Sequence, residues 1–424
     1  MIPSRATELE IYALATGGRG LARARDGRVV LVEGALPGER VYARLVREHR
    51  SWLEAACLEV VTPSPRRVEP ACPYFGSCGG CDLMHLEHAA QLEAKVTWLR
   101  EALRRLEPPG PEVLAPLPPW GRRNRLRLQL REGRVGFFAR RSHRLVEVRG
   151  CAVAAAGIDR VLKALTRPLP EGGRWLELLA GEEDGGVWAC LGLEEGVSPR
   201  QAEALVEALS AAGVRGVRVA GRRWACDQDH GLCYHRGGGG LELWAFPGLF
   251  CQVGFAANRL LLEWLQAQVG AGEGRPALDL YAGSGNLGLT LAAAGWRVTA
   301  VERARGAGEA FAWQAARAGL SGRVGFRGRD AARAVAELAG EGARFPLVVL
   351  DPPRAGAKGV MEGVVHLEPE VVVYVSCHPA ALGRDAAVLA GAGYSPRGLA
   401  LVDMFPHTGQ VEAALVMRRG AQGA

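Results

Sequence analysis

The sequence predicts a multidomain α/β protein with an N-terminal β-barrel, a mixed α+β centre and a C-terminal doubly wound sheet. Three observations carry this prediction. Short alternating apolar runs fill residues 6–61, arginines are concentrated between residues 122 and 149, and helical stretches alternate with apolar strands from residue 258 onward. We place the domain boundaries at residues 1–62, 63–248 and 249–424.

The composition is that of a folded protein without a membrane anchor. The chain has 424 residues, and its hydrophobic content of 48% is sufficient for real cores. No signal peptide precedes Glu8, and no apolar run approaches the roughly 18 residues that a membrane span requires. We therefore expect a cytoplasmic monomer with no membrane partner.

The first 62 residues show the pattern of a small β-barrel of the oligonucleotide-binding kind. Tight turns at Gly17-Gly18, Asp26-Gly27 and Pro37-Gly38 separate the apolar runs. The five expected strands are Leu9 to Ala13, Gly20 to Ala24, Val29 to Val32, Arg40 to Val46 and Leu53 to Val61. An inert β-module is the alternative to a barrel that binds nucleic acid.

A cluster of cysteines follows the barrel and predicts a metal centre. Three of them lie within ten residues of one another and are interspersed with glycines: Cys72, Cys78 and Cys81. No second close pair of the kind found in zinc knuckles stands near them, so one remote cysteine completing a [4Fe–4S] cluster is the better fit. We select Cys151 as the fourth ligand, with the Cys226 and Cys233 pair as the rival.

The central region combines helical stretches with a block of arginines. Apolar residues at helical spacing predict a helix from Leu86 to Leu106, and further helices are expected at Ala154 to Leu165 and Pro199 to Ala212. Ten arginines stand between residues 122 and 149 against two glutamates, within a net charge of +7. Clustered arginine suits phosphate and base contacts, so nucleic acid is a candidate partner, although a solvated face is also common.

The last part of the chain predicts seven strands in a doubly wound sheet. These strands are Pro276 to Tyr281, Arg297 to Glu302, Val324 to Arg327, Leu347 to Leu350, Val371 to Val375, Gly398 to Met404 and Ala413 to Arg418. The glycine turn after the first strand lacks both the Rossmann dinucleotide spacing and the Walker lysine, which weakens nicotinamide and nucleoside triphosphate interpretations.

Three of these strands end in polar residues, which predicts a site at the carboxyl edge of the sheet. The residues are Asp279, Asp351 and Cys377. Pro379 begins a helix directly after Cys377, and the positive end of that helix would favour a thiolate. Cys377 could therefore be a nucleophile, or it could be a small core hydrophobe.

The glycine turn and the next two strand ends indicate a nucleoside cofactor without phosphates. Tyr281, Gly283 and Gly285 belong to the turn. Glu302 is placed to bind two ribose hydroxyls, and Asp330 could meet an adenine amino group. S-adenosylmethionine is the obvious candidate for this cofactor.

With these residues in view, the chain resembles the RNA uracil-5-methyltransferases that carry a TRAM domain and an iron–sulfur cluster, and most closely their ribosomal-RNA branch. The resemblance covers almost the whole chain. Besides the four cysteines and Gln252, it rests on DLYAGSGN, DPPRAG, VSCHPAALGRD and DMFPHTGQVE. It implies that the barrel is a TRAM domain and that the helix within residues 84–111 packs on the catalytic domain.

The resemblance also implies roles for individual residues. Cys377 falls on the nucleophile and Glu412 on the base, and Arg127 matches the catalytic-site arginine. The positions of the cofactor and the target base are Gln252, Asp279, Glu302 and Asp351. The sequence departs from the family pattern at three places: Gly254 replaces Asn, Ala282 replaces Cys, and Trp313-Gln314-Ala315 replaces an Asn-Ala pair.

The implied reaction is methylation of C5 in a flipped-out uridine through a covalent bond from Cys377 to C6. The resemblance favours 23S ribosomal RNA as the substrate, with transfer RNA as the alternative. An amino-group RNA methyltransferase would need no cysteine nucleophile. A non-catalytic RNA-binding protein would be expected to have lost the cofactor residues, which are present here.

Overall fold

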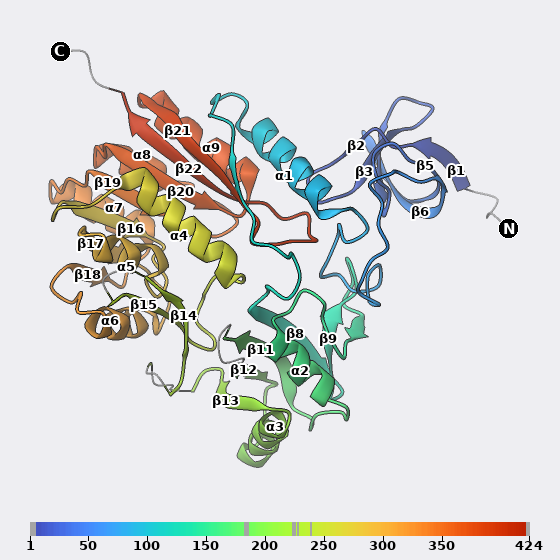
Figure 1. Cartoon of the computed structure of the whole chain (residues 1–424), viewed down its shortest axis with the longest axis horizontal. Helices are drawn as coiled ribbons and strands as arrows, with labels where there is room; N and C mark the ends of the chain where they lie inside the picture. The colour runs from blue at the N-terminus through green and yellow to red at the C-terminus, as the bar shows by residue number, and fades with distance from the viewer. Residues whose placement is uncertain (1–5, 182–185, 223–225, 227–228, 238–239, 421–424) are drawn as a thin grey trace. The chain divides into compact units, whose positions relative to one another are not determined.

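The computed structural model describes residues 6–181, 186–222, 226, 229–237 and 240–420 (Figure 1). The chain divides into two compact units. The first comprises Met1–Trp98, Phe137–Val146 and Phe405–Gln410, and the second comprises Leu99–Gly136, Glu147–Met404 and Val411–Ala424.

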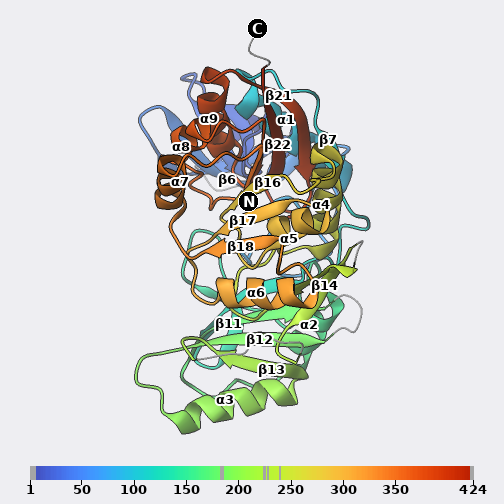
Figure 2. The same cartoon turned by 90° about the vertical axis from the view of Figure 1, so that its left-hand side faces the viewer.

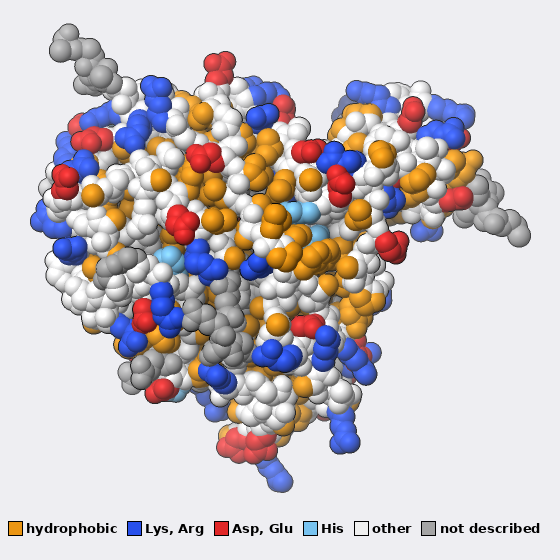
Figure 3. Space-filling model, viewed as in Figure 1, with side chains coloured by type: hydrophobic (Ala, Val, Ile, Leu, Met, Phe, Trp, Pro, Cys, Tyr) orange, Lys and Arg blue, Asp and Glu red, His pale blue; other side chains and the backbone are white. Residues whose placement is uncertain are grey.

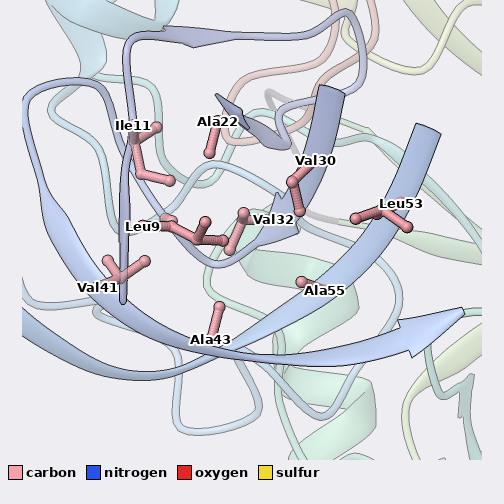
Figure 4. Packing of buried hydrophobic residues seen from close by; sticks show 10 residues of the cluster. Leu9, Ile11, Ala22, Val30, Val32, Val41, Ala43, Leu53 and Ala55 are labelled. Carbon is pink, nitrogen blue, oxygen red and sulfur yellow. The ribbon is translucent and has the colours of Figure 1, made fainter. Parts of the chain in front are cut away.

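The first unit contains a six-stranded curved sheet in the order β1-β5-β6-β4-β3-β2. Its strands are β1 (Ala6–Glu10), β2 (Ala13–Leu14), β3 (Gly20–Arg23), β4 (Val29–Glu33), β5 (Arg40–Glu48) and β6 (Trp52–Thr62). Alternate apolar side chains such as Val30, Val32 and Val41 point into one core inside the sheet (Figure 4). The β-rich N-terminal module expected from the sequence is confirmed.

One strand of this module differs from the expectation. The run from Leu9 to Ala13 is not continuous, because Ile11 bonds to a turn instead of a neighbouring strand. Its amide donates to the carbonyl of Glu39 at 2.9 Å, and its own carbonyl accepts from the amide of Gly38 at 2.8 Å. β1 and β2 are therefore separate strands, and the module has six strands among the described residues.

The central sheet has the order β10-β9-β8-β11-β12-β13. The strands are β8 (Arg125–Arg131), β9 (Arg134–Phe138), β10 (Leu145–Glu147), β11 (Gly173–Ala180), β12 (Val187–Leu193) and β13 (Val214–Val219). Helix α2 (Ala156–Ala164) packs on β11 and β12, and α3 (Pro199–Ala211) lies beside β13 (Figure 2). On β8, Leu126 and Leu128 are buried whereas Arg127 is exposed, so one face of the sheet presents basic side chains.

The second unit contains an eight-stranded sheet in the order β18-β17-β16-β19-β20-β22-β21-β7. Seven of its strands were predicted: β16 (Pro276–Leu280), β17 (Arg297–Val301), β18 (Val324–Arg327), β19 (Leu347–Leu350), β20 (Val371–Ser376), β21 (Tyr394–Val402) and β22 (Glu412–Arg419). The eighth, β7 (Glu112–Leu114), comes from far upstream and pairs parallel to β21. β22 runs antiparallel to both of its neighbours.

Helices cover both faces of this sheet, which makes it doubly wound as predicted. α4 (Phe255–Val269) and α5 (Asn286–Ala293) lie on one face, and α7 (Ala331–Gly340), α8 (Met361–His366) and α9 (Pro379–Gly391) lie on the other (Figures 1 and 2). α6 (Ala307–Arg317) packs beside β18 and the separate hairpin of β14 (Leu232–Arg236) and β15 (Glu242–Ala245).

The expected helix from Leu86 to Leu106 is α1 (His88–Leu103). Among the described residues, no helix combines the length and apolar character needed to span a membrane.

Candidate active site

The sheet brings Asp351, Cys377 and Glu412 to the same edge. β19 and β20 are parallel neighbours that end at Leu350 and Ser376, so Asp351 and Cys377 both follow the carboxyl end of a strand. β22 runs in the opposite direction and pairs Ala413 with Ser376. Glu412 is the first residue of β22, and it therefore lies beside the end of β20, which Cys377 follows.

Burial makes the carboxyl groups at this edge hard to ionise. Glu412 is 3% exposed, and burial together with the nearby Asp351 raises its pKa well above the ordinary value. Burial raises the pKa of Asp351 to about 7, and a hydrogen bond from Gln252 partly opposes this increase. In that bond, Gln252 Nε2 donates to Asp351 Oδ2 at 2.8 Å.

The thiol of Cys377 is held in the neutral form, contrary to the effect expected from the following helix. Burial raises its pKa to about 11, and Glu412 and Asp351 add to the increase while Arg354 opposes it. One of the amides at the start of α9 is already satisfied, because the amide of Ala381 donates to His378 Nδ1 at 3.1 Å. In the ligand-free structure, a proton must therefore leave Cys377 before it can act as a thiolate.

Strand β16, just before the glycine turn, carries a buried carboxyl group without a good partner. Asp279 is 1% exposed, and neither of its oxygens has a well-formed hydrogen bond among the described residues. Burial raises its pKa well above the ordinary value, against a weaker effect of the nearby Gly288 amide. A Cβ on Gly288 would lie 2.6 Å from Asp279 Oδ2, so this glycine is needed for the approach. Such a carboxylate fits a cationic amino group of a ligand.

Glu302 is aligned by the backbone around the same turn. The amide of Gly283 donates to one carboxylate oxygen at 3.2 Å, and the amide of Ala304 donates to the other at 2.7 Å. A carboxylate has about four acceptor positions, so hydroxyl groups of a ligand can still bind it. Asp330, by contrast, caps α7 by accepting from the amide of Ala332 at 3.1 Å.

Arg127 lies on the exposed face of the central sheet, in the same compact unit as Cys377. The contact described for its guanidinium is with the ring of Trp175, at 4.0 Å from the ring centroid. The β8–β11 register places Glu177 opposite Arg127, and Glu177 accepts a 2.7 Å bond from Arg125. The cation–π contact and this register hold Arg127 at a defined position.

Sequence reasoning missed the side chain that anchors the segment carrying Gln252. Asn124 is 1% exposed, and its backbone amide donates to the carbonyl of Val253 at 2.7 Å. Its side chain also accepts from the amide of Phe255 at 3.2 Å and donates to Ala180 at 3.1 Å. The only available signal was an asparagine between arginines, which suggested nothing about buried hydrogen bonds.

The predicted cluster cysteines are divided between the two compact units. Cys72, Cys78 and Cys81 belong to the first, where the loop is held by a 3.0 Å bond from Gly79 to Phe138, and Cys151 belongs to the second. Among the described residues, no three His, Cys, Asp or Glu side chains are gathered closely enough to hold a metal ion. The rival pair Cys226 and Cys233 packs against the apolar cluster around Trp244.

Comparisons with known proteins identify similar chains over the full length. A family model described as conserved hypothetical protein 95 matches residues 257–381. A 23S rRNA (uracil(1939)-C(5))-methyltransferase RlmD of Alkalilimnicola ehrlichii is 36% identical over 99% of this chain and 98% of its own. The protein of the same name from Halomonas elongata is 37% identical, with 98% of this chain and 91% of its own covered.

Among solved structures, the fold is similar to that of the Pyrococcus abyssi tRNA (uracil-54, C5)-methyltransferase in complex with S-adenosyl-L-homocysteine. The TM-score is 0.74 at 22% identity, and the match covers 97% of this chain and 100% of the other. This likeness extends through the β-rich N-terminal region, the central region and the doubly wound sheet.

Proposed function

The chain belongs to the family of 23S rRNA (uracil-C5)-methyltransferases, and we propose from this that it transfers a methyl group from S-adenosylmethionine to C5 of a uridine in 23S ribosomal RNA. The observation that carries the proposal is the meeting of Cys377, Asp351 and Glu412 at one sheet edge. We also propose a cytoplasmic location, because ribosomes are assembled there.

Mapping of 5-methyluridine in total RNA, with and without the gene, tests this function. We expect one or a few 23S rRNA positions to lose the methyl group in the deletion strain and to regain it when the gene is returned. Purified protein should methylate unmodified 23S rRNA in vitro. Loss confined to transfer RNA would support the alternative substrate, and methyl groups found only on amino nitrogens would overturn C5 chemistry.

The residues at the sheet edge account for the steps at the uracil ring. The Cys377 thiol first loses its proton to solvent, and the thiolate sulfur then bonds to C6. The displaced electron pair moves to C5, which is otherwise a poor nucleophile. S-adenosylmethionine, when bound, would supply the methyl group from a positively charged sulfur, which would leave as a neutral thioether when C5 takes the methyl group. Glu412 must be in its carboxylate form for the next step, in which it removes the C5 proton. The C6–sulfur bond then breaks, and the aromatic ring is restored.

Two further residues act on the target base. We assign Asp351 to orient the uracil edge, because Gln252 fixes its carboxyl group beside Cys377. We assign Arg127 to stabilise negative charge on the uracil oxygens as C5 becomes nucleophilic. The target uridine must leave its stack to reach these groups, at a cost of a few kcal/mol that contacts to the RNA must offset.

The cofactor site combines residues from the glycine turn, from the carboxyl ends of β16, β17, β18 and β19, and from the loop before α4. Its proposed members are Gln252, Asp279, Tyr281, Gly283, Gly285, Glu302, Asp330 and Asp351. The unpartnered carboxyl group of Asp279 supports binding of the methionine ammonium group. Glu302, held by two amides, is suited to accept the ribose hydroxyls.

We propose three domains: a TRAM domain at residues 1–62, a central RNA-binding domain at 63–248 and a methyltransferase domain at 249–424.

The central domain would carry a [4Fe–4S] cluster on Cys72, Cys78, Cys81 and Cys151. The cysteine spacing supports this cluster, and its role would be structural because uracil methylation requires no electron. Protein purified without oxygen should be brown and carry about four irons per chain. Stoichiometric zinc without iron would contradict the cluster.

RNA binding through phosphates is supported by the basic face of β8 and by basic side chains over the region of β8, β11 and α2 (Figure 3). Arg140 is a poor probe, because its ion pairs with Glu33 at 2.9 Å and Asp82 at 3.0 Å give it a structural role. Arg131 on the exposed end of β8 is a better one.

We expect the affinity for RNA to fall steeply with salt, with a log–log slope of about −0.7 for each phosphate contacted in a single strand. Arg131→Glu should weaken all RNAs alike and flatten this slope, because a phosphate contact is lost. Arg333→Glu, on the 72% exposed arginine of α7, is the matched control and should change neither value. Filter binding at several salt concentrations measures the affinity for RNA and its dependence on salt. A flat slope for the wild-type protein would contradict phosphate binding.

A further inference from the structure

The hairpin of β14 and β15 is fastened to the glycine turn by Gln314, one of the residues that departs from the family pattern. Gln314 lies on α6 and is 1% exposed. Its Oε1 accepts from the backbone amide of Trp244 on β15 at 2.6 Å. Its Nε2 donates to the carbonyl of Ser284 at 2.7 Å and to that of Ala310 at 3.2 Å. Each partner is a backbone group of fixed donor or acceptor type, so the orientation of the amide is unambiguous.

A second contact joins the same hairpin to the other end of the turn. The Tyr234 hydroxyl on β14 donates to Asn286 Oδ1 at 3.0 Å. Asn286 and Asn258 exchange side-chain hydrogen bonds of 2.8 and 2.9 Å. Ser284 and Asn286 flank Gly285, so the hairpin is connected to both sides of this glycine.

The turn between these contacts has a backbone that needs external support. Gly283 and Gly285 have φ values of 55° and 109°, in the left-handed region. Glycine loses the most conformational freedom on ordering, so an unsupported turn would sample many shapes. The same turn contributes the Gly283 amide that binds Glu302.

Aromatic and ionic contacts hold α6 against β15 and so keep Gln314 in place. The Trp313 ring meets the Trp244 ring edge to face, with centroids 5.3 Å apart. Arg317 at the end of α6 pairs with Glu242 of β15 at 2.6 Å. An asparagine at position 314 would be one methylene shorter and could not reach both Trp244 and Ser284.

We propose that Gln314 and Tyr234 are positioning residues through which the β14–β15 hairpin holds the glycine turn in the shape that binds the cofactor. This inference rests on the proposed use of S-adenosylmethionine. Neither residue is proposed to touch the cofactor. Their contribution is to prepare the turn, so they should change cofactor affinity more than the rate of the chemical step.

Calorimetric titration with S-adenosylhomocysteine tests the proposal directly. Gln314→Met preserves the length of the side chain but removes its hydrogen bonds, and we expect it to weaken binding about tenfold. Gln314→Asn should weaken binding of S-adenosylhomocysteine to a similar extent, and Tyr234→Phe should weaken it about threefold. In methylation assays the KM for cofactor should rise in parallel, whereas kcat and the KM for RNA should change less than twofold.

Gln91→Met is the matched control for a loss of buried hydrogen bonds. Gln91 is fully buried in the first unit, where its side chain donates to Leu83 and Leu86 and accepts from the amide of His407. We expect a loss of thermal stability similar to that of Gln314→Met with unchanged cofactor affinity.

Unchanged binding in the folded Gln314 variants, or an equal loss in Gln91→Met, would overturn the positioning role. If Gln314→Met does not fold, Tyr234→Phe decides the outcome through the same titration. Failure of the wild-type protein to bind S-adenosylhomocysteine would instead count against the proposed cofactor.

Discussion

Replacing Cys377 by alanine is expected to lower methyl transfer by roughly 10⁴-fold or more, a loss typical of removing a catalytic nucleophile. Without the sulfur, no bond forms at C6 and C5 remains a poor nucleophile, so neither product nor covalent complex should appear. Transfer of radiolabelled methyl groups to a target-uridine RNA measures the loss.

Cys190→Ala provides a matched control for this change. Burial also raises the pKa of the Cys190 thiol to about 11, but this residue lies on β12 of the central sheet. Its removal should leave most of the activity. A Cys377→Ala protein with more than a few per cent of wild-type activity would exclude the nucleophilic role.

Glu412→Gln should give the opposite phenotype, with a covalent enzyme–RNA complex that accumulates. Attack at C6 and methyl transfer precede the step that needs Glu412, so the variant should stop with methylated RNA still bonded to Cys377. The variant should fold, because burial raises the pKa of Glu412 well above its ordinary value, so the surroundings of this side chain disfavour a charge and tolerate a neutral group. Glutamine has nearly the same shape as the protonated acid.

Denaturing electrophoresis with labelled cofactor separates these outcomes. A protein–RNA band is expected for Glu412→Gln and should vanish in the double variant with Cys377→Ala. A band from the cysteine variant alone, or none from a folded glutamine variant, would show that the two roles are wrongly assigned.

The edge of the catalytic sheet could be predicted because strand ends are visible in the sequence. Runs such as Val371 to Val375 are apolar and β-branched, and the polar residue that follows each run marks where the strand stops. Parallel neighbours then place these residues at a common edge. The protonation of Cys377 was not predictable, because it depends on burial and on Glu412, which stands 35 positions later in the chain.

Residues that act through buried hydrogen bonds escaped prediction for a different reason. Asn124 carries no motif, and Gln314 stood out only as a departure from the family pattern, which says nothing about its hydrogen bonds. Their importance arises from backbone groups of other elements, such as the amides of Phe255 and Trp244. Sequence periodicity indicates which face of an element is buried, but it does not identify the partners of a polar side chain on that face.

The short strand β7 limits how the chain can be divided. Glu112 pairs with Ala400, about 290 positions further along, and its carboxylate accepts a 2.9 Å bond from the Trp264 indole. A catalytic fragment that starts at residue 249 would leave the apolar edge of β21 uncovered, which invites association with other chains. During synthesis, β7 must likewise wait for almost the whole protein to emerge before its partner exists. A soluble catalytic fragment should therefore retain Glu112–Leu114, and tags or cleavage sites are better placed upstream of that strand.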